Sequence, residues 1–142
     1  MNIRIAALDN AIAITALNLE LGYPASDLQV RQWLSELLLS SNHCVIVAEH
    51  GSEVSGWLVV EKRLSLETGY KAEITGLIVS KNFRRSGIAR ELVAAAERWS
   101  LNKKLSRMIV LSNVARAEAH DFYRSQDFVL TKTAHNYEKH IS

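Results

Sequence analysis

The sequence predicts an α/β fold in which helices flank a mixed, mostly antiparallel central sheet. Two apolar runs, "CVIVAEH" and "VSGWLVVEKR", lie on either side of the turn "HGSE", as the strands of a hairpin do. A third run, "KAEITGLIV", is followed by an amphipathic helix and then by the short apolar run "RMIVL". Because a strand, a helix and a strand in this order need a right-handed parallel crossover, the sheet is expected to contain one parallel strand pair.

Two helices are expected before the first of these strands. The first runs from about Asp9 to Leu21 and ends at "GYP", a glycine and proline stop signal. The second begins at Ser26, which forms a capping box with Gln29 three residues later. Its apolar residues recur at the three-and-four spacing of one helix face: Val30, Trp33, Leu34, Leu37 and Leu38.

The remaining elements come after the hairpin. The run from Lys71 to Val79 is nearly all apolar after Glu73, which predicts a central strand covered on both faces. The next helix carries an apolar face of Ile88, Leu92, Ala95, Ala96 and Trp99. After it we expect a short strand at "RMIVL", a short helix at "RAEAHDFYRSQ" and a terminal pair of strands at "FVLTKT" and "HNYEKHI".

Composition limits the functional classes. At 142 residues and 48% hydrophobic side chains, the chain is expected to form a single domain over residues 1–142. The net charge of +2 arises from 17 basic and 15 acidic residues spread along the sequence, which gives no strong attraction to nucleic acid or membranes. The sequence lacks an apolar run of the ~18 residues needed to span a bilayer, and its lone cysteine, Cys44, lies in a core-like run. These features predict a soluble cytoplasmic protein.

The turn "NFRRSGIA" is the sharpest local signal. It leads from the central strand into a helix, and the first turn of a helix offers unpaired N–H groups and partial positive charge. Gly87 permits close approach to the backbone, while Arg84 and Arg85 add full charges. Two interpretations of the turn alone remain open: a site for a phosphate-bearing cofactor, or a plain strand-to-helix connection. The sequence contains neither a P-loop nor a G-x-G-x-x-G motif.

The stretch "EITGLIVSKNFRRSGIARELV" resembles the central motif of the GCN5-related N-acetyltransferases, the GNAT superfamily. That motif reads Arg or Gln, two residues, Gly, one residue, then Gly or Ala, and Arg84, Gly87 and Ala89 fill these places. A second stretch, "SNVARAEAHDFYRSQDF", is similar to a later motif of the same family. Two motifs in the right order are more specific than either alone, and the order of elements matches along nearly the whole chain.

The resemblance implies a coenzyme A site. In the family, amides of the turn hold the pyrophosphate of acetyl coenzyme A, and the preceding strand pairs with the pantetheine arm. The residues so implied to bind the cosubstrate acetyl-CoA are Leu77, Ile78, Val79, Arg84, Arg85, Ser86, Gly87, Ile88, Ala89, Asn113, Ala119 and Tyr123. No metal is expected, because the histidines and Cys44 show no metal-ligand spacing.

Two catalytic residues are implied by the same resemblance. Tyr123 matches the tyrosine that protonates the coenzyme A thiolate. Glu73 lies fourteen residues before Gly87, where one branch of the family carries its general base. An alternative remains open for Glu73: a solvated charge, or an ion pair with Lys71 or Arg63. One departure is Asp127, which stands where the family usually has Gly, although aspartate tolerates the left-handed backbone that can end a helix.

The acceptor is the least determined part. An N-acetyltransferase would use a primary amine on a small metabolite, an aminoglycoside-like molecule or a protein, and Glu20, Tyr23, Glu67 and Tyr70 are candidates to face a cationic acceptor. Two other functions remain open: a catalytically weak coenzyme A-sensing or interaction module of the same fold, and a nucleotide-binding regulator. The terminal run "HNYEKHI" could also pair across a homodimer.

Overall fold

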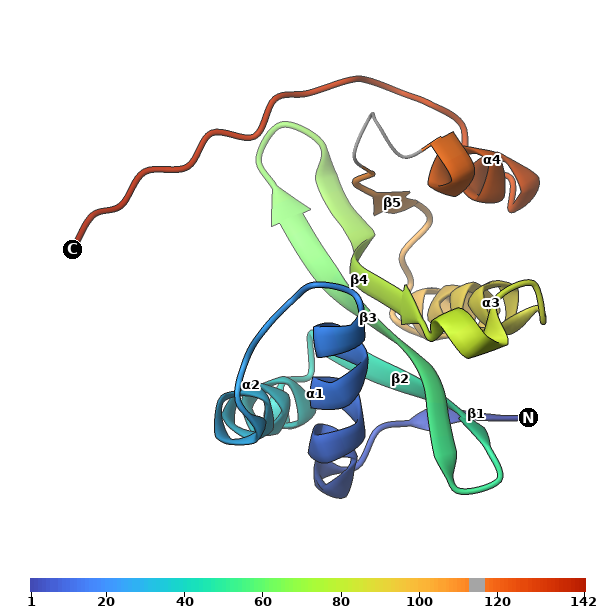
Figure 1. Cartoon of the computed structure of the whole chain (residues 1–142). Helices are drawn as coiled ribbons and strands as arrows, with labels where there is room; N and C mark the ends of the chain where they lie inside the picture. Colours follow the sequence, from blue (N-terminus) through green and yellow to red (C-terminus); the bar gives the residue numbers. More distant parts are fainter. Residues whose placement is uncertain (113–116) are drawn as a thin grey trace. The chain divides into compact units, whose positions relative to one another are not determined.

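A computed structural model describes residues 1–112 and 117–142 of the chain. The chain divides into two compact units, residues 1–110 and 111–142, and each unit is described by itself. Figure 1 colours them along the sequence, with the first unit running from blue to orange and the second from the orange helix to the red C-terminal segment.

The first unit contains a twisted sheet of five strands in the order β1-β2-β3-β4-β5 (Figure 1). The strands are β1 Asn2–Ile5, β2 His43–His50, β3 Glu53–Ser65, β4 Gly69–Val79 and β5 Met108–Val110. Neighbours from β1 to β4 pair antiparallel, whereas β4 and β5 pair parallel. The predicted mixed, mostly antiparallel sheet with one parallel pair is therefore confirmed.

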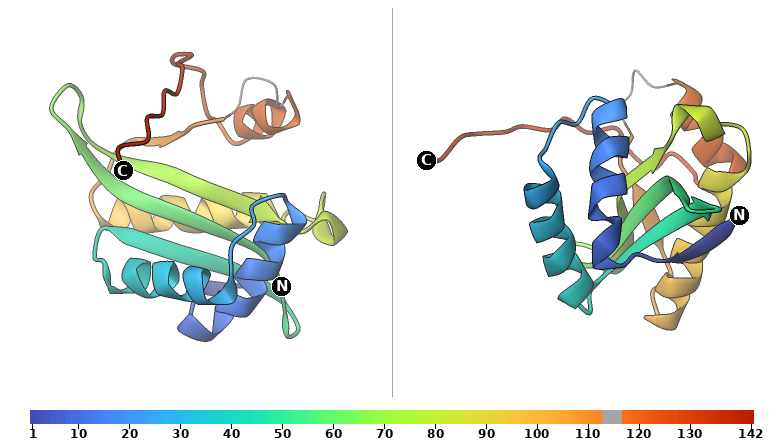
Figure 2. Two further views of the ribbon diagram at one scale, coloured as in Figure 1. Left: turned by 60° about the vertical axis from the view of Figure 1, so that its left-hand side comes forward. Right: turned by 60° about the horizontal axis from the view of Figure 1, so that its bottom comes forward.

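Helices of the first unit cover both faces of this sheet. They are α1 Ala11–Glu20, preceded by the 3-10 turn η1 Leu8–Asn10, then α2 Asp27–Leu39 and α3 Ile88–Asn102. Figure 2 shows α1 and α2 side by side on one face and α3 alone on the other. The second unit holds the helix α4 Ala117–Ser125.

Helix α2 begins as its capping signal predicts. The Ser26 hydroxyl accepts a hydrogen bond from the Gln29 amide at 3.1 Å, and the Ser26 amide donates to the Gln29 side chain at 3.0 Å. These bonds satisfy two donors that the helix start leaves unpaired. Val30 and Leu34 are buried as expected, but Trp33 is 51% exposed and lies at the margin of the apolar face.

Successive side chains along each strand point to opposite faces of the sheet, so the core has two layers. Val45, Val47 and Val59 pack with residues of α1 and α2. Leu58 and Val60 point to the opposite face, where Leu92 of α3 is also fully buried. Because both faces of the sheet are covered, its central strands are apolar over long runs.

Two parts of the strand order differ from the sequence prediction. Strand β1 was not predicted; it pairs with Ile46 to Glu49 of β2, about forty residues away in the sequence. The predicted terminal strands are wrong: residues 128–142 form no strand, and Val129, Leu130 and Tyr137 are largely exposed. A strand needs a hydrogen-bonded neighbour, and this segment has none among the described residues. Pairing of "HNYEKHI" across a homodimer stays a prediction.

A close contact between β3 and β4 fixes the position of α1. The Trp57 indole donates to the Asn18 side chain of α1 at 3.0 Å. The Cζ3–Cη2 edge of the same ring approaches Gly76, where an added Cβ would stand 2.6 Å and 2.7 Å from these two atoms. Glycine at 76 therefore leaves the space that the edge of the indole occupies while its N–H reaches α1.

We predict that Gly76→Ala destabilises the first unit by about 1–3 kcal/mol, the usual range for an overpacked core. The methyl group would push the Trp57 ring away and break its hydrogen bond to Asn18. Chemical denaturation would measure the loss. Thr75→Ala, at the exposed neighbouring position, is the matched control and should change the free energy of unfolding by less than about 0.5 kcal/mol. Equal stabilities for the two variants would contradict the prediction.

Candidate active site

Strands β4 and β5 stay paired for only three residues. Ala72, Glu73 and Ile74 lie opposite Met108, Ile109 and Val110, and there the pairing ends. At this point β4 carries a bulge, because Ile74 and Gly76 face consecutive residues of β3 and leave Thr75 as an extra residue. A bulge bends its strand and strengthens the local twist. From Thr75 to Val79, β4 has no strand on its β5 side among the described residues.

This open edge leads into a turn that other elements hold firmly. The Ser80 amide donates to the Ser55 carbonyl at 2.8 Å, which keeps the strand end on β3. A short 3-10 turn, η2 Lys81–Phe83, comes next, and the Phe83 ring stacks on His50 of β2 at 4.8 Å between centroids. The Lys81 amide donates to the Glu20 carboxylate at 2.7 Å. Three separate elements therefore position the turn.

The motif "RRSG" occupies the exposed part of the turn. Arg84, Arg85 and Ser86 are exposed, and the Ser86 hydroxyl donates back to the Phe83 carbonyl. Arg85 and Gly87 both have left-handed backbones, with φ of 63° and 83°. Gly87 is the N-cap of α3, and an added Cβ there would meet only the Arg90 side chain, 3.7 Å away. The turn thus presents open backbone beside two arginines and the start of a long helix.

Close packing under the first turn of α3 keeps that helix start near the end of β4. A Cβ added at Gly56 would stand 2.8 Å from the Ile78 carbonyl oxygen and 3.3 Å and 3.4 Å from Ile88 and Leu92. Ile88 is fully buried, so its side chain anchors the helix while its backbone remains part of the turn. Leu77, Ile78 and Val79 are half-buried along the open edge, and Ala89 is half-buried in the first turn of α3. The predicted residues from Leu77 to Ala89 therefore form one continuous feature.

Glu73 is nearly buried and paired with Arg63. Arg63 Nη1 donates to Glu73 Oε1 at 2.6 Å, and the exposed fractions of the two side chains are 49% and 11%. Lys71, the other candidate partner, bonds instead to the Thr68 hydroxyl at 3.1 Å. The structure thus rules out a solvated charge at Glu73 and selects Arg63 as its partner. The role of Glu73 as a base stays a prediction.

In the second unit, Ala119 and Tyr123 are half-buried on α4, whereas Asn113 lies outside the described residues. Helix α4 ends in a Schellman motif: the Phe128 amide donates to the Tyr123 carbonyl at 3.0 Å and the Asp127 amide to the Arg124 carbonyl at 3.1 Å. Asp127 has φ of 66°, so it fills the place usually taken by glycine, as expected. The rings of Tyr123 and Phe128 meet edge to face at 5.6 Å.

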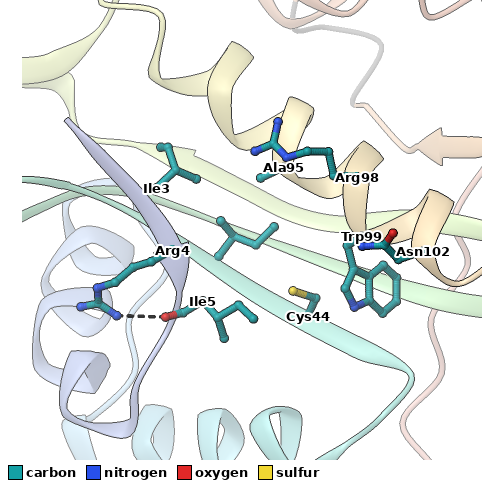
Figure 3. Close-up of a pocket in the computed structure, with 9 residues that line it drawn as sticks. Ile3, Arg4, Ile5, Cys44, Ala95, Arg98, Trp99 and Asn102 are labelled. Carbon is teal, nitrogen blue, oxygen red and sulfur yellow. Dashed lines mark hydrogen bonds between the residues drawn. The ribbon is translucent and has the colours of Figure 1, made fainter.

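A separate pocket of about 250 Å³ lies near the other end of α3 (Figure 3). It is lined by Ile3, Arg4, Ile5, Cys44, Ile46, Ala95, Arg98, Trp99 and Asn102. Burial raises the pKa of the Cys44 thiol, and the charge of Lys103 opposes this only in part. A thiol held protonated in this way is a poor nucleophile, consistent with Cys44 as a packing residue.

Comparison with known proteins decides the family. The model of the acetyltransferase (GNAT) family matches residues 11–128. The chain belongs to the acetyltransferase (GNAT) family. Among curated protein sequences, none matches the chain.

Solved structures agree with this assignment at the level of the fold. An aminoglycoside antibiotic 6'-N-acetyltransferase from Acinetobacter haemolyticus is 22% identical, with a TM-score of 0.86 and 100% of both chains covered. The aminoglycoside acetyltransferase AAC(6')-Iy, bound to a bisubstrate analogue of coenzyme A and acetylneamine, is 20% identical, with a TM-score of 0.88 over 99% and 98% of the two chains. A putative acetyltransferase from Agrobacterium tumefaciens is 17% identical, with a TM-score of 0.86 over 98% and 100%.

Membrane-spanning helices and metal-ligand clusters are both absent from the described part of this GNAT member. Residues 1–112 and 117–142 include no helix that is both long and apolar enough to cross a bilayer. The same residues bring together no group of three or more His, Cys, Asp or Glu side chains suited to a metal ion.

We predict that Glu20→Ala loosens the turn after β4. The Lys81 amide would lose its acceptor, so its hydrogen exchange should speed up by about 10-fold if that bond is worth the usual ~1.5 kcal/mol for a charged acceptor. Hydrogen exchange measured by NMR would test it. Glu36→Ala, on the exposed face of α2, is the control and should leave the exchange of Lys81 unchanged. Unaltered exchange in Glu20→Ala would show that the carboxylate does not hold the turn.

Proposed function

We propose that this protein is an acetyl-CoA-dependent N-acetyltransferase that moves the acetyl group to a primary amine by direct attack in a ternary complex. The observation that carries the proposal is the open edge of β4, which runs without interruption into the glycine turn at the start of α3 in a GNAT family member. Unpaired strand backbone leading to a helix start suits a ligand with an amide-bearing arm and a phosphate group.

The residues present fit coenzyme A. The backbone of Leu77, Ile78 and Val79 would pair with the pantetheine arm as a further strand would. Amides of the turn from Arg84 to Ala89, with the charge of the two arginines, would hold the pyrophosphate. Open space at Gly87 supports this assignment, because a side chain there would project toward the ligand rather than into the protein. We further assign Asn113 and Ala119 to the cofactor site on the family motif.

Acetyl-CoA would supply an activated thioester, and the chain's own residues would manage the charges. Glu73 would accept a proton from the acceptor ammonium, directly or through a water molecule, so that the amine is neutral when it attacks. A backbone N–H near Leu77 or Ile78 would stabilise the carbonyl oxygen as negative charge develops. The Tyr123 hydroxyl would donate a proton to the departing thiolate and regain one from the nitrogen, which still carries an excess proton when the tetrahedral intermediate collapses.

The acceptor is proposed to be a cationic amine, either a small metabolite or aminoglycoside-like molecule or a protein amino group. Aminoglycoside acetyltransferases among the structural neighbours support the small-molecule class, at identities of 20–22%. Tyr23 and Tyr70 are 57% and 55% exposed and so are accessible to an acceptor. The Lys62 Nζ atom lies 4.7 Å from the centroid of the Tyr70 ring, and this cation–π contact is the kind of interaction that a cationic acceptor would make there.

A coenzyme A-sensing module of the same fold is the second candidate, since the open edge and turn would serve binding without turnover. Release of free thiol from acetyl coenzyme A in the presence of an amine panel separates the two. Amine-dependent thiol release supports the enzyme, and tight binding without release supports the sensor.

We predict that acetyl coenzyme A raises the melting temperature and that ATP does so much less. A ligand selective for the folded state at 100 times its Kd stabilises it by about 2.7 kcal/mol. Gly87→Val should fold and yet lose most of this shift, because its methyl groups occupy the approach to the turn. Gly51→Val is the matched control: Gly51 also has a left-handed backbone, with φ of 60°, but lies in the β2–β3 turn.

The comparison of these two variants removes the effect of backbone strain, which both share. A normal shift in Gly51→Val with a lost shift in Gly87→Val supports the site. If neither acetyl coenzyme A nor free coenzyme A shifts the wild-type melting temperature, the proposed function is wrong.

Tyr123→Phe should keep the affinity for acetyl coenzyme A and lower kcat by an amount in or somewhat below the ~100-fold to ~10,000-fold range of general acid catalysis. The substitution removes one proton donor and leaves the ring contacts with Phe122 and Phe128 in place. Steady-state kinetics with thiol detection would measure the effect. Tyr137→Phe, in the exposed tail, is the control. A wild-type kcat in Tyr123→Phe would mean that the thiolate leaves without this donor.

A further inference from the structure

A pair of carboxylates faces each other across the two strands that precede the open edge. Glu61 of β3 stands directly opposite Glu73 of β4 in the antiparallel register. Residues in such a pair lie on the same face of the sheet with their Cβ atoms about 5 Å apart, and like charges in this arrangement repel. The sheet therefore needs compensating positive charge at this place.

Each carboxylate has a nitrogen partner of its own, His43 beside Glu61 and Arg63 beside Glu73. His43 Nε2 lies 3.2 Å from Glu61 Oε2, and His43 stands opposite Glu61 on β2. Arg63 lies two residues beyond Glu61 on the same strand, hence on the same face, and reaches Glu73 diagonally. The two contacts are not equivalent, because the Glu73 side chain is 11% exposed and the Glu61 side chain 29%.

The burial of Glu73 makes Arg63 necessary. A nearly buried carboxylate without a partner carries a large desolvation cost, and removal of one member of such a pair leaves the other uncompensated. Arg63 itself is half-exposed and donates through one terminal nitrogen to Oε1. Among the described residues it is the one ion-pair partner of Glu73. Its single bond leaves Oε2 as the oxygen able to take a proton.

We infer that Arg63 is a positioning residue for Glu73: it fixes Oε1 by the diagonal ion pair and so presents Oε2, in a constant orientation, to the acceptor amine. This inference rests on the proposed function, in which Glu73 is the base. The sequence leaves two roles open for Glu73, general base and ion-pair partner. The inference combines them, because the ion pair with Arg63 holds the base in place. Arg63 acts only through Glu73 and touches no reacting atom.

A double-mutant cycle tests this dependence. Glu73→Gln should lower kcat by about 100-fold, within the usual range for a general base, and Arg63→Ala by about 10-fold, with the KM for acetyl coenzyme A unchanged in both. In the Glu73→Gln background, Arg63→Ala should change kcat by less than about 2-fold, because a positioning residue has nothing left to position. Arg63→Lys should restore kcat to within about 3-fold of the wild type, since one bond to one oxygen does not need the guanidinium fork.

Arg4→Ala is the matched control. It removes another arginine–glutamate pair between adjacent strands, Arg4 and Glu49 on β1 and β2, and should leave kcat unchanged at temperatures where all variants are folded. Melting temperatures measured alongside would define that range.

The outcomes separate the two levels of the proposal. Additive effects of Arg63→Ala and Glu73→Gln, an unchanged or raised kcat in Arg63→Ala, or failure of Arg63→Lys to recover activity would each overturn the positioning role while leaving the enzyme intact. Wild-type kcat in Glu73→Gln would also overturn it, since Glu73 would not be the base. A wild-type protein that acetylates no amine would instead overturn the proposed function, and the positioning role with it.

Discussion

Backbone amides and carbonyls at a sheet edge must bond to water or to a ligand where no strand pairs with them, and among the described residues no strand pairs with the β5 side of β4 between Thr75 and Val79. The bulge at Thr75 turns the strand at the point where its pairing with β5 ends. The residues after β4 keep this edge defined: Ser80 is tied to β3, and the next turn is tied to α1 and β2. The end of the open edge is thus held by contacts to β2, β3 and α1.

The two faces of the sheet carry different parts of the proposed chemistry. Helix α3 packs on one face, and its buried Ile88 and Leu92 seat the helix start that the phosphate group would meet. The other face belongs to α1 and α2, and alternation from Trp57 and Val59 places Glu61 and Arg63 on that side. The buried start of α3 and the carboxylates of Glu61 and Glu73 therefore lie on opposite faces of one strand pair.

The sequence was informative where structure depends on local periodicity and chain order. The capping box at Ser26, the apolar face of α3 and the strand, helix, strand unit were all predictable, since each is encoded within a few turns or strands. Strand β1 was missed because its four residues form a strand only through pairing with β2, far along the chain. The prediction of terminal strands was wrong for a related reason: an alternating apolar pattern does not show whether another strand is available to pair with the segment. The clamp of Glu20 on Lys81 spans sixty-one residues, and no local pattern could choose Arg63 over Lys71 for Glu73.

The contact of Trp57 with Gly76 means that the residue types allowed at these two positions depend on each other. A ring at 57 demands the absence of a side chain at 76, and a larger residue at 76 would be tolerated only with a smaller one at 57. Such an exchange would also cost the link to Asn18, so α1 would have to be reattached by some other contact. Relatives that carry a larger residue at 76 should therefore lack tryptophan at 57, and an engineered library that randomises β4 while keeping Trp57 will contain many destabilised members at this site.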